Sequence, residues 1–407
     1  MVTHLDVIDI EQLRLNASKS NQLALGYPVN REHAFTIDLN LLGIIPDSMS
    51  TTYLNNIASP YYHGEYTTDN IKDIEVKLIN LLGKHFNVSL DDIFGYVTYG
   101  GTEANFASLW WHRNYLVQHY NIKPVLICSS HSHYSLKKIA NQLDLELIEV
   151  EANYAGINYV HLESILKNLK KPIIFSANFG ATVDGTIDDV ILIKSLLDKH
   201  IPNKYKIHGD GAIYGLFIPY LEKYMQVNSI FDFVDSLSFS GHKFLGTYNI
   251  SGVVLSKKSY LTKVFLNKDI QVSYLQNAID ITSSGSRQGL FSLELYLLLE
   301  KALEYSPIDN NQTNLEALWH KCLSNAQSFY SKITTIVGKS HPLLWYNNYQ
   351  LSLIIPAPKD KDKKDYLGRK YGLMPVDKFQ YGIYIFPRSS NTALTAFLAD
   401  YKGIMNE

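Results

Sequence analysis

The sequence has little cysteine, no long apolar segment and no excess of charge of one sign. Its 407 residues include only two cysteines, Cys128 and Cys322, which argues against a disulfide framework and indicates buried thiols in a reducing compartment. No segment reaches the ~18 apolar residues of a membrane-spanning helix, and the N-terminus lacks the basic start and apolar core of a signal peptide. The 37 basic and 39 acidic residues are mixed along the chain, so no basic footprint for nucleic acid or a membrane surface stands out. These absences predict a cytoplasmic protein without a nucleic-acid or membrane partner.

Short apolar segments alternate with amphipathic ones between residues 93 and 256. The apolar segments, which include "PVLICSS", "PIIFSANFG" and "VDSLSFS", have the length of strands, and the stretches between them have the length and periodicity of helices. This alternation implies crossover connections and a mostly parallel sheet with helices on both faces. The predicted fold class is therefore α/β, and in such sheets ligands bind beyond the carboxyl ends of the strands.

The chain is long enough for more than one hydrophobic core, and its pattern changes toward both ends. We expect an N-terminal segment over residues 1–65, a large domain over 66–305 and a small α/β domain over 306–407. In the small domain, "QLSLIIPAP" and "YGIYIFP" predict strands, and "NTALTAFLADYKGI" predicts a closing helix. The run "KDKDKKDY" between the two strands alternates in charge, which predicts a solvated loop.

Two glycines and a threonine follow the strand pattern in "VTYGGTEANF". Gly100 and Gly101 precede a helical pattern that has Thr102 near its N-cap position. Free backbone N–H groups, the helix dipole and a hydroxyl group converge there, which suits a phosphate-sized anion. Because ordinary tight turns show the same pattern, it indicates an anion site only in combination with other groups.

Two histidines, His131 and His133, follow the next apolar segment. One interpretation is an exposed polar loop. A second is a metal site with Cys128, for which the sequence offers no further Cys or His at a usable spacing. A third is an imidazole ring that lies flat on a planar ligand, and the local sequence does not decide among the three.

An aspartate and a lysine end two later strand patterns, about one βα unit apart. Asp210 lies between glycines in "HGDGAIYG", and Lys243 ends "SFSGHK". A lone aspartate in a turn is usually a local backbone acceptor, and a lone lysine after a strand is usually a surface residue. The glycines at positions 209, 211 and 215 read G-x-G-x-x-x-G, one residue longer than the dinucleotide fingerprint. A nicotinamide-dependent oxidoreductase is therefore the weaker interpretation, and it leaves Lys243 unexplained.

Four groups thus follow separate strands at one expected edge of the sheet: the glycine turn, His133, Asp210 and Lys243. They offer an anion site, a ring for stacking, a carboxylate and an amine. A phosphorylated, planar, cationic aldehyde needs those four partners. The sequence therefore predicts pyridoxal 5'-phosphate as the cofactor.

Six motifs carry a resemblance to a known family. In order and spacing, "GGTEAN", "HSHYSLKKIA", "ATVDGTIDD", "HGDGAIYG", "SFSGHK" and "SGSRQG" resemble the pyridoxal-phosphate-dependent group II amino acid decarboxylases, over residues 25–289 and more weakly to the C-terminus. Within the family the resemblance is strongest to bacterial histidine decarboxylase, followed by plant serine decarboxylase. It implies the type I, aspartate aminotransferase-like fold, a homodimer with active sites at the subunit interface, and release of carbon dioxide from an L-amino acid.

The resemblance also implies a role for each matching residue. Lys243 would hold the cofactor as a Schiff base, Asp210 would face the ring nitrogen, and His133 would stack on the ring. The other implied contacts are Ala212 on the second ring face, Gly101, Thr102, Ser240 and His242 at the phosphate, Thr182 near the ring hydroxyl, and a partner-subunit segment with Ser283, Ser284 and Ser286.

The substrate and one proton donor stay open at this point. L-Histidine, converted to histamine, is the leading expectation, and serine or an aromatic amino acid is the alternative. Family members often have Gly-Asp-Pro where this chain has Ala58, Ser59 and Pro60, in a segment that borders the substrate pocket of the family. The acid that returns a proton to Cα is either His133 or a loop tyrosine such as Tyr274.

Overall fold

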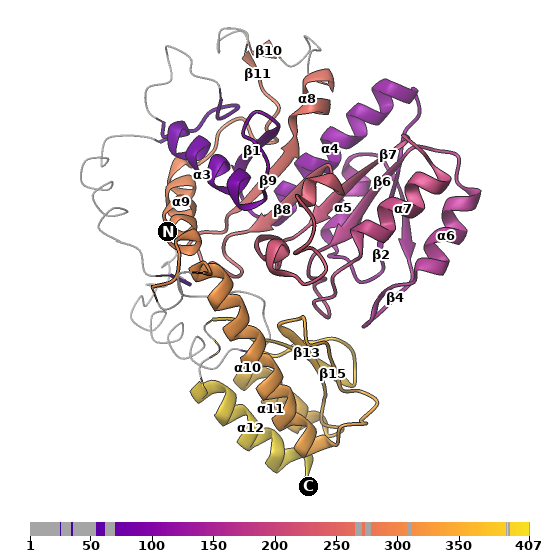
Figure 1. The fold of residues 1–407 in the computed structure, drawn as a ribbon. Helices are drawn as coiled ribbons and strands as arrows, with labels where there is room; N and C mark the ends of the chain where they lie inside the picture. The colour runs from indigo at the N-terminus through magenta and orange to yellow at the C-terminus, as the bar shows by residue number, and fades with distance from the viewer. Residues whose placement is uncertain are drawn as a thin grey trace, which may run out of the picture. The chain divides into compact units, whose positions relative to one another are not determined.

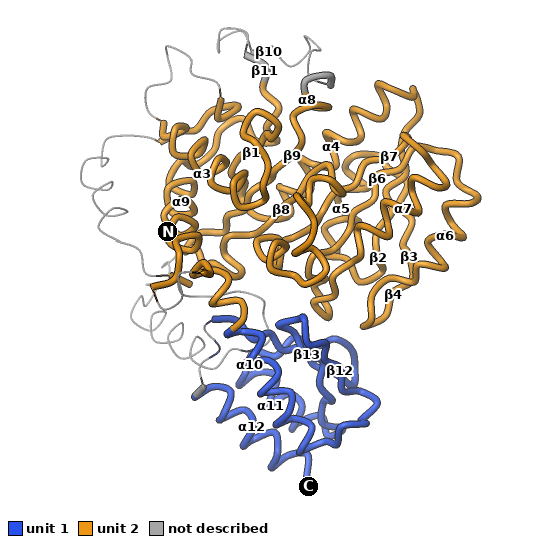
Figure 2. The backbone as a smooth tube through the Cα atoms, viewed as in Figure 1, with its two compact units in different colours: residues 1–31, 321–407 blue, residues 32–320 orange. Residues whose placement is uncertain are grey.

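The computed structural model describes residues 25, 34–35, 54–61, 70–264, 271–272, 278–307, 311–387, 389 and 391–406. The chain divides into two compact units, which Figure 2 colours separately. The larger unit comprises Glu32–His320, and the smaller one comprises Met1–Arg31 and Lys321–Glu407. The segment boundaries expected after residues 65 and 305 remain predictions. Within the described residues, no helix is long and apolar enough to cross a membrane.

A seven-stranded sheet forms the centre of the larger unit (Figure 1). Its strand order is β1-β9-β8-β7-β6-β2-β3, and every pairing is parallel except the two that β9 makes with β1 and β8. The strands are β1 (Ile93–Thr98), β2 (Val125–Ser129), β3 (Glu146–Val150), β6 (Ile173–Asn178), β7 (Tyr205–Asp210), β8 (Ser236–Ser240) and β9 (Gly252–Lys257). The predicted α/β class with a mostly parallel sheet is confirmed.

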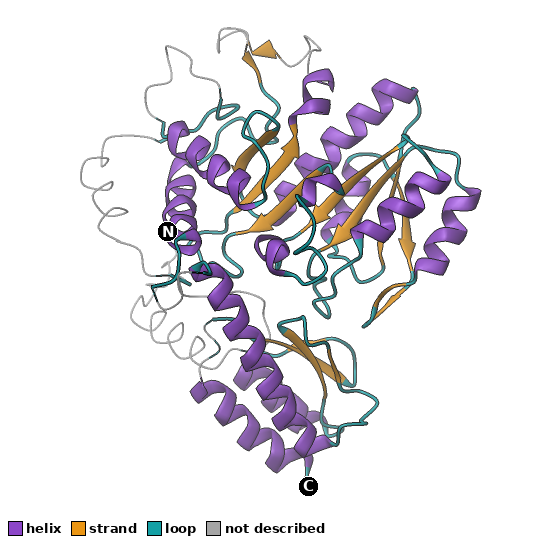
Figure 3. Cartoon of the chain, viewed as in Figure 1, coloured by secondary structure: helices purple, strands orange, loops and turns teal. Residues whose placement is uncertain are grey.

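Helices cover this sheet, some in front of it and some behind it in Figure 3. They are α3 (Lys72–His85), α4 (Gly101–Tyr120), α5 (Ser135–Gln142), α6 (Tyr159–Asn168), α7 (Val190–His200), α8 (Lys258–Val264) and α9 (Gly289–Leu303). Short elements complete the unit: the hairpins β4 (Ala152–Asn153) with β5 (Gly156–Ile157) and β10 (Gln271–Val272) with β11 (Ala278–Ile279), and the 3₁₀ helices η1 (Gly215–Tyr220) and η2 (Ile230–Asp232). Because helices cover the sheet, central strands such as β6 are buried along their whole length, whereas the edge strand β3 is half exposed.

The strand directions bring the ends of five strands together. Parallel pairing places the carboxyl ends of β2, β6, β7 and β8 at one edge of the sheet. Strand β1 ends at the same edge, since the reversed strand β9 separates it from β8. The residues that were predicted to carry chemistry follow these strands, so the topology gathers their loops at one place.

The smaller unit contains a four-stranded antiparallel sheet in the order β12-β13-β15-β14. Its core is apolar and aromatic, with Phe329, Tyr371, Phe397 and Tyr401 among its buried members and Leu25 joining them from the N-terminal part. The elements are β12 (Trp345–Tyr346), β13 (Ser352–Pro356), α11 (Lys361–Tyr371), β14 (Met374–Pro375), β15 (Gln380–Tyr384) and α12 (Asn391–Met405), while α10 (Asn314–Val337) contains the division between the units.

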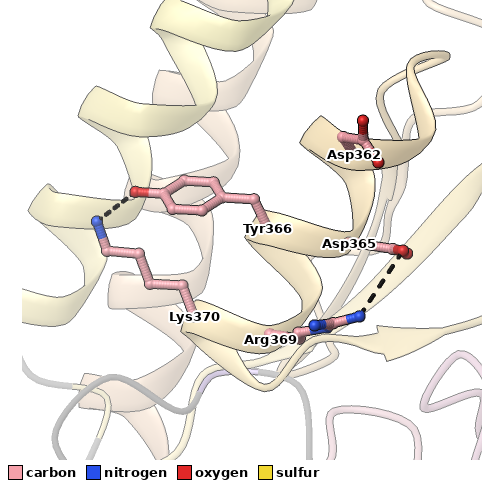
Figure 4. Close-up of a pocket in the computed structure, with 5 residues that line it drawn as sticks. All are labelled: Asp362, Asp365, Tyr366, Arg369 and Lys370. Carbon is pink, nitrogen blue, oxygen red and sulfur yellow. Dashed lines mark hydrogen bonds and ion pairs between the residues drawn. The ribbon is translucent and has the colours of Figure 1, made fainter.

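The loop predicted for "KDKDKKDY" is wrong, because most of this run forms the start of helix α11. Asp360 caps the helix by accepting a hydrogen bond from the backbone N–H of Lys363, and Leu367 and Tyr371 supply its buried face. The alternating charges suggested a loop because both buried residues, Leu367 and Tyr371, come after the run. Figure 4 shows the solvent side, where the side chains lining an open hollow of about 540 Å³ are Asp362, Asp365, Tyr366, Arg369 and Lys370. None of the predicted cofactor residues lies there.

Candidate active site

The glycine turn after β1 allows close packing at the start of helix α4. Gly100 is the N-cap residue, and its backbone φ of 109° is one that residues with a side chain rarely adopt. A Cβ atom on Gly101 would lie 2.7 Å from the Ser240 Oγ and 3.3 Å from the Ala212 Cβ. The first turn of α4 therefore lies close to the loops after β7 and β8, and the first backbone N–H groups of a helix have no acceptor within the helix.

Eight of the ten predicted cofactor residues line one cavity of about 250 Å³ at the carboxyl edge of the sheet. These eight are Gly101, Thr102, His133, Asp210, Ala212, Ser240, His242 and Lys243. They come from the loops or strand ends after β1, β2, β7 and β8. The structure thus brings together groups that lie more than a hundred residues apart in sequence, while their individual roles remain predictions.

Asp210, the last residue of β7, is a buried carboxylate in the wall of this cavity. Its side chain is 5% exposed. The Oδ2 atom accepts a hydrogen bond from the amide nitrogen of Asn105 at 2.7 Å, and Oδ1 accepts one from the backbone N–H of Ala212 at 3.2 Å. Since each carboxylate oxygen can accept two hydrogen bonds, Asp210 retains capacity for a donor that enters the cavity.

Lys243 follows β8 and extends into the same cavity. Burial lowers the pKa of its ammonium group, and the nearby carboxylate of Asp210 partly offsets this shift. A lowered pKa raises the fraction of neutral amine at physiological pH, and the neutral amine is the form that attacks an aldehyde. The environment of Lys243 therefore suits covalent chemistry better than a surface salt bridge.

His133 has one ring nitrogen fixed by the turn in which it lies. Its Nδ1 accepts a hydrogen bond from the backbone N–H of Ser135 at 3.2 Å, and the Ser135 hydroxyl is 2.7 Å from the same nitrogen. In the neutral ring the proton must then be on Nε2. Burial lowers the pKa of His133, with Lys243 acting in the same direction and Asp210 against it.

His242 is oriented by the opposite nitrogen pattern. Its Nδ1 lies 3.2 Å from the carbonyl oxygen of Ser251 and donates to it. Burial lowers the pKa of His242, although the bond to Ser251 raises it. The Nε2 atom is thereby available for a ligand, and an anion beside it would favour protonation of the ring.

The other two predicted residues, Thr182 and Ser284, do not line the cavity. Thr182 lies in the loop after β6. Ser284 donates a hydrogen bond to the Oε1 of Glu103 at 2.7 Å, and Ser283 donates to the same atom at 2.6 Å, so both serines contact α4 of their own chain. The hydroxyl oxygen of Ser286 accepts a hydrogen bond from the Asn55 amide nitrogen of the same chain, at 3.2 Å. Tyr274 lies outside the described residues.

The structure gives no support for a metal site at His131 and His133 within the residues that it describes. No group of three or more His, Cys, Asp or Glu side chains there could hold a metal ion. Instead, the Nδ1 of His131 lies 2.8 Å from a carboxylate oxygen of Asp184, and this contact raises the pKa of His131. Cys128 is buried as a free thiol.

The glycines of the turn after β7 serve packing within the protein. A Cβ atom on Gly211 would lie 2.5 Å from the Cα of Gly215 and 2.7 Å from the carbonyl oxygen of Ser238. A Cβ atom on Gly209 would lie 2.8 Å from the ring of Phe179. These close approaches explain the glycine spacing without a dinucleotide pyrophosphate.

Asn105, which lines the cavity and donates a hydrogen bond to Asp210, was not among the residues predicted from the sequence. Two signals could have found it. Asn105, Ser108 and His112 recur at helical spacing on α4, which places polar groups on a buried face. The serines of "SLSFS" alternate along β8, so they lie on one face of the sheet.

The residues that line the cavity fit pyridoxal phosphate. The first turn of α4 with Gly101 and Thr102, together with Ser240 and His242, offers N–H and O–H donors of the kind that a phosphate group needs. Asp210 is a buried carboxylate for a protonated ring nitrogen, and Lys243 is an amine of lowered pKa for an aldehyde. The donor set therefore covers the phosphate, the ring nitrogen and the aldehyde of this cofactor.

Comparison with known proteins leads to the same cofactor. The sequence profile described as "Pyridoxal-dependent decarboxylase conserved domain" matches residues 57–335. A histidine decarboxylase of Solanum lycopersicum is 32% identical over 363 residues, which cover 88% of this chain and 79% of that protein. Serine decarboxylase 2 of Oryza sativa subsp. japonica is 32% identical over 340 residues, covering 83% of this chain and 66% of that protein.

Solved structures agree on the fold. L-methionine decarboxylase from Streptomyces sp. 590 superposes with a TM-score of 0.75 at 19% identity, over 97% of this chain and 95% of that one. Glutamate decarboxylase from Lactobacillus brevis also gives a TM-score of 0.75, at 17% identity, over 100% of this chain and 94% of that one. The predicted type I fold, the cofactor and the amino acid decarboxylase activity are thus confirmed, and this chain belongs to the pyridoxal-dependent decarboxylase family.

Proposed function

We propose that this enzyme converts L-histidine to histamine and carbon dioxide. The observation that carries the proposal is the cavity in which Lys243, Asp210 and His133 meet beside an anion-binding helix end. Histidine as the substrate is supported by two kinds of relative, the Solanum lycopersicum enzyme and the histidine decarboxylase of Acinetobacter baumannii, which is 29% identical over 323 residues. Serine is the second candidate, because the Oryza sativa serine decarboxylase has the same 32% identity as the Solanum enzyme.

Pyridoxal phosphate, when bound, supplies a cationic ring that accepts the electron pair left by cleavage of the Cα–carboxylate bond. The protein has to orient this ring and keep its nitrogen protonated. Asp210 would do so as the carboxylate that faces the ring nitrogen, and its two hydrogen bonds to Asn105 and Ala212 hold it in place.

The phosphate would be held by groups from three loops. The first turn of α4 offers backbone N–H groups and the Thr102 hydroxyl, Ser240 offers a second hydroxyl, and His242 offers its Nε2. Lys243 would hold the aldehyde carbon covalently. When the substrate amine displaces Lys243, the phosphate contacts and the stacked His133 would keep the ring in place, so that the substrate carboxylate could be held perpendicular to it, which favours decarboxylation.

His133 would stack on the ring and carry the proton for Cα on its Nε2. Because Ser135 fixes Nδ1 as an acceptor, the single proton of the neutral ring lies on the nitrogen that is available to a ligand. Replacement of His133 by Phe keeps a stacking ring and removes the proton, so it separates the two roles. An unchanged rate in H133F would restrict His133 to stacking.

The proposal includes a cytoplasmic homodimer. The segment with Ser283, Ser284 and Ser286 would complete the neighbouring subunit's site, and Ala181–Thr186, which contains Thr182, would approach the ring hydroxyl of its own cofactor. The buried state of both cysteines is compatible with a reducing compartment. Sedimentation of the purified protein tests the dimer, and a monomer that is fully active would contradict it.

A panel of L-amino acids tests the substrate. Purified enzyme loaded with pyridoxal phosphate is mixed with histidine, serine, tryptophan, tyrosine, methionine or glutamate, and carbon dioxide and amine are measured. The proposal predicts that histidine has the highest kcat/KM. A higher value for serine would move the assignment to serine decarboxylase, and release from none of the six would contradict the decarboxylase assignment of this site.

A further inference from the structure

A chain of buried polar groups lies behind Asp210, and of its members only Asn105 has a role in the mechanism proposed above. Asn105 and His112 contribute to it from α4, His208 from β7, and Ser236 and Ser238 from β8. All five are at most 2% exposed. Buried polar groups at a helix–sheet contact cost stability compared with apolar packing unless they are well bonded, so such a chain calls for a functional explanation.

Within this hydrogen-bonded chain, the side-chain amide of Asn105 is the group that contacts Asp210. Its Nδ2 donates to Asp210 Oδ2 at 2.7 Å. Its Oδ1 lies 2.6 Å from the hydroxyl oxygen of Ser238 and 3.0 Å from the Nε2 of His208. An amide oxygen only accepts, so both Ser238 and His208 must donate to Asn105. The reversed amide would set its oxygen, an acceptor, against the carboxylate oxygen of Asp210, which also only accepts.

The next hydrogen bonds of the chain, farther from Asp210, also have their donors on the side away from Asp210. His208 is neutral, because burial lowers its pKa to about 3, and its one proton is used on Nε2. Its Nδ1 must then accept from the Ser236 hydroxyl, 2.9 Å away. With that hydroxyl proton committed, His112 must donate to Ser236 from its Nε2, at 3.2 Å.

His112, at the end of the chain farthest from Asp210, is consistent with this direction of donation. His112 is also neutral, with burial lowering its pKa to about 3, so its Nδ1 carries no proton. This Nδ1 is buried and has no hydrogen-bond partner among the described residues. An unpaired acceptor at the His112 end is what the chain requires, since every proton in it points toward Asp210.

We propose that Asn105 is a positioning residue that transmits the donation of His208 and Ser238 to Asp210 and so holds this carboxylate toward the ring nitrogen of the cofactor. This inference rests on the proposed roles of Asp210 and the cavity. Successive hydrogen bonds polarise one another, so a chain whose protons all point at one carboxylate strengthens its last bond. The carboxylate also gains a fixed orientation from two bonds on different oxygens, to Asn105 and Ala212.

The test compares two cofactors in variants that lack bound cofactor. One cofactor is pyridoxal phosphate, and the other is its analogue with a carbon in place of the ring nitrogen, which keeps the phosphate and aldehyde contacts. Dissociation constants are measured by fluorescence titration. The matched control is Ser108→Ala, because Ser108 lies on the same buried face of α4 and its hydroxyl has no partner among the described residues.

For Asn105→Ala we expect binding of pyridoxal phosphate to weaken about 10-fold, which corresponds to loss of one hydrogen bond to a charged group. Binding of the carbon analogue should change less than about 2-fold, because Asp210 has no ring nitrogen to meet. Ser238→Ala, which removes one of the two donors to Asn105, should show the same selectivity with a smaller loss of about 3-fold. Ser108→Ala should leave both constants unchanged.

Equal weakening for both cofactors in N105A would overturn the role of Asn105, because damage to the fold does not depend on the ring atom. If N105A does not fold, S238A decides by the same criterion. Failure of the unsubstituted protein to bind either compound would instead overturn the proposed site itself, so the two failures are distinguishable.

Discussion

The two units bury different kinds of side chain. The smaller unit has an aromatic and aliphatic core, and its buried polar residues among those described are Gln350, Ser352 and Gln380, none of them charged. The larger unit buries charged groups as well, including Lys72, Glu75, Asp188, Asp210 and Arg287. Buried charges cost free energy unless they are paired or used. The buried charges of the larger unit include Asp210 of the candidate site, whereas apolar packing dominates the described core of the smaller unit.

The charged groups of the smaller unit stay near the surface. On α11 and α12, Lys370 lies 2.7 Å from Asp400, and the two side chains are 35% and 28% exposed. The buried pair of the larger unit, Arg287 with Glu75, is 3% and 0% exposed.

The largest effect should come from Asp210→Asn. The variant keeps the size of the side chain but removes the negative charge beside the ring nitrogen, and we expect kcat to fall about 10³-fold, as for loss of a preorganised electrostatic partner. Turnover is measured as release of carbon dioxide at saturating cofactor. Ser352→Ala, which removes a buried hydroxyl from the smaller unit, should leave kcat unchanged. Undiminished turnover in D210N would remove Asp210 from this role.

Breaking the buried ion pair should strongly destabilise the protein. Glu75 accepts hydrogen bonds from Arg287, from the backbone N–H of Val97 at 2.7 Å and from the Asn56 amide at 2.9 Å. Glu75→Ala leaves the Arg287 charge buried and unpaired, so we expect a loss of about 3–5 kcal/mol in the free energy of unfolding by urea. Asp400→Ala in the smaller unit should cost at most about 1 kcal/mol. Similar losses in the two variants would remove the contrast between the units.

Acid should destabilise the larger unit through its buried histidines. The folded-state pKa of His208 is about 3, below the unfolded value near 6.5, so between these values the unfolded chain binds more protons. Stability therefore falls as the pH falls, and His208 contributes a loss of about 2 kcal/mol between pH 7 and pH 5. His208→Gln should remove this part of the pH dependence, which urea unfolding at the two pH values measures. An identical pH dependence in H208Q would show that His208 accepts a proton in the folded protein.

A smaller, stabilising effect is expected at Ala58. This residue has a φ of 57° in the left-handed region and is buried, with its carbonyl oxygen accepting a hydrogen bond from Arg287. Glycine adopts this conformation without strain, so Ala58→Gly should raise the free energy of unfolding by about 1 kcal/mol. Ala393→Gly, in helix α12 of the smaller unit, should lower it by a similar amount. A loss in A58G would mean that the conformation is held without strain.

Much of the larger unit could be predicted from the sequence, because its signals are local. Apolar strands followed by polar residues identified β2, β6, β7 and β8, and parallel pairing then implied that Asp210 and Lys243 would meet. The chain of buried polar groups behind Asp210 could not be predicted in the same way. Asn105 acts through contacts with residues of β7 and β8 that follow it by more than a hundred positions, and pairwise distances between such residues are set by packing of α4 on the sheet.

In the smaller unit, the sequence-based prediction was wrong for a surface helix rather than for buried contacts. Its two longer strands, β13 and β15, and its closing helix α12 were predicted, but α11 was taken for a loop because most of its residues lie on the solvent face. Only Leu367 and Tyr371 are buried along this helix. A short surface helix with two buried positions has almost no periodic signal, so the Asp360 cap was the better indicator.

Identification of the lysine that binds the cofactor decides whether Lys243 has the proposed role. The protein is incubated with pyridoxal phosphate, reduced with borohydride to make the bond permanent, digested and analysed by peptide mass spectrometry. The account predicts a cofactor-derived mass increase on Lys243, absent from the Lys243→Ala variant. A label on a different lysine, or no label at all in the unsubstituted protein, would contradict it.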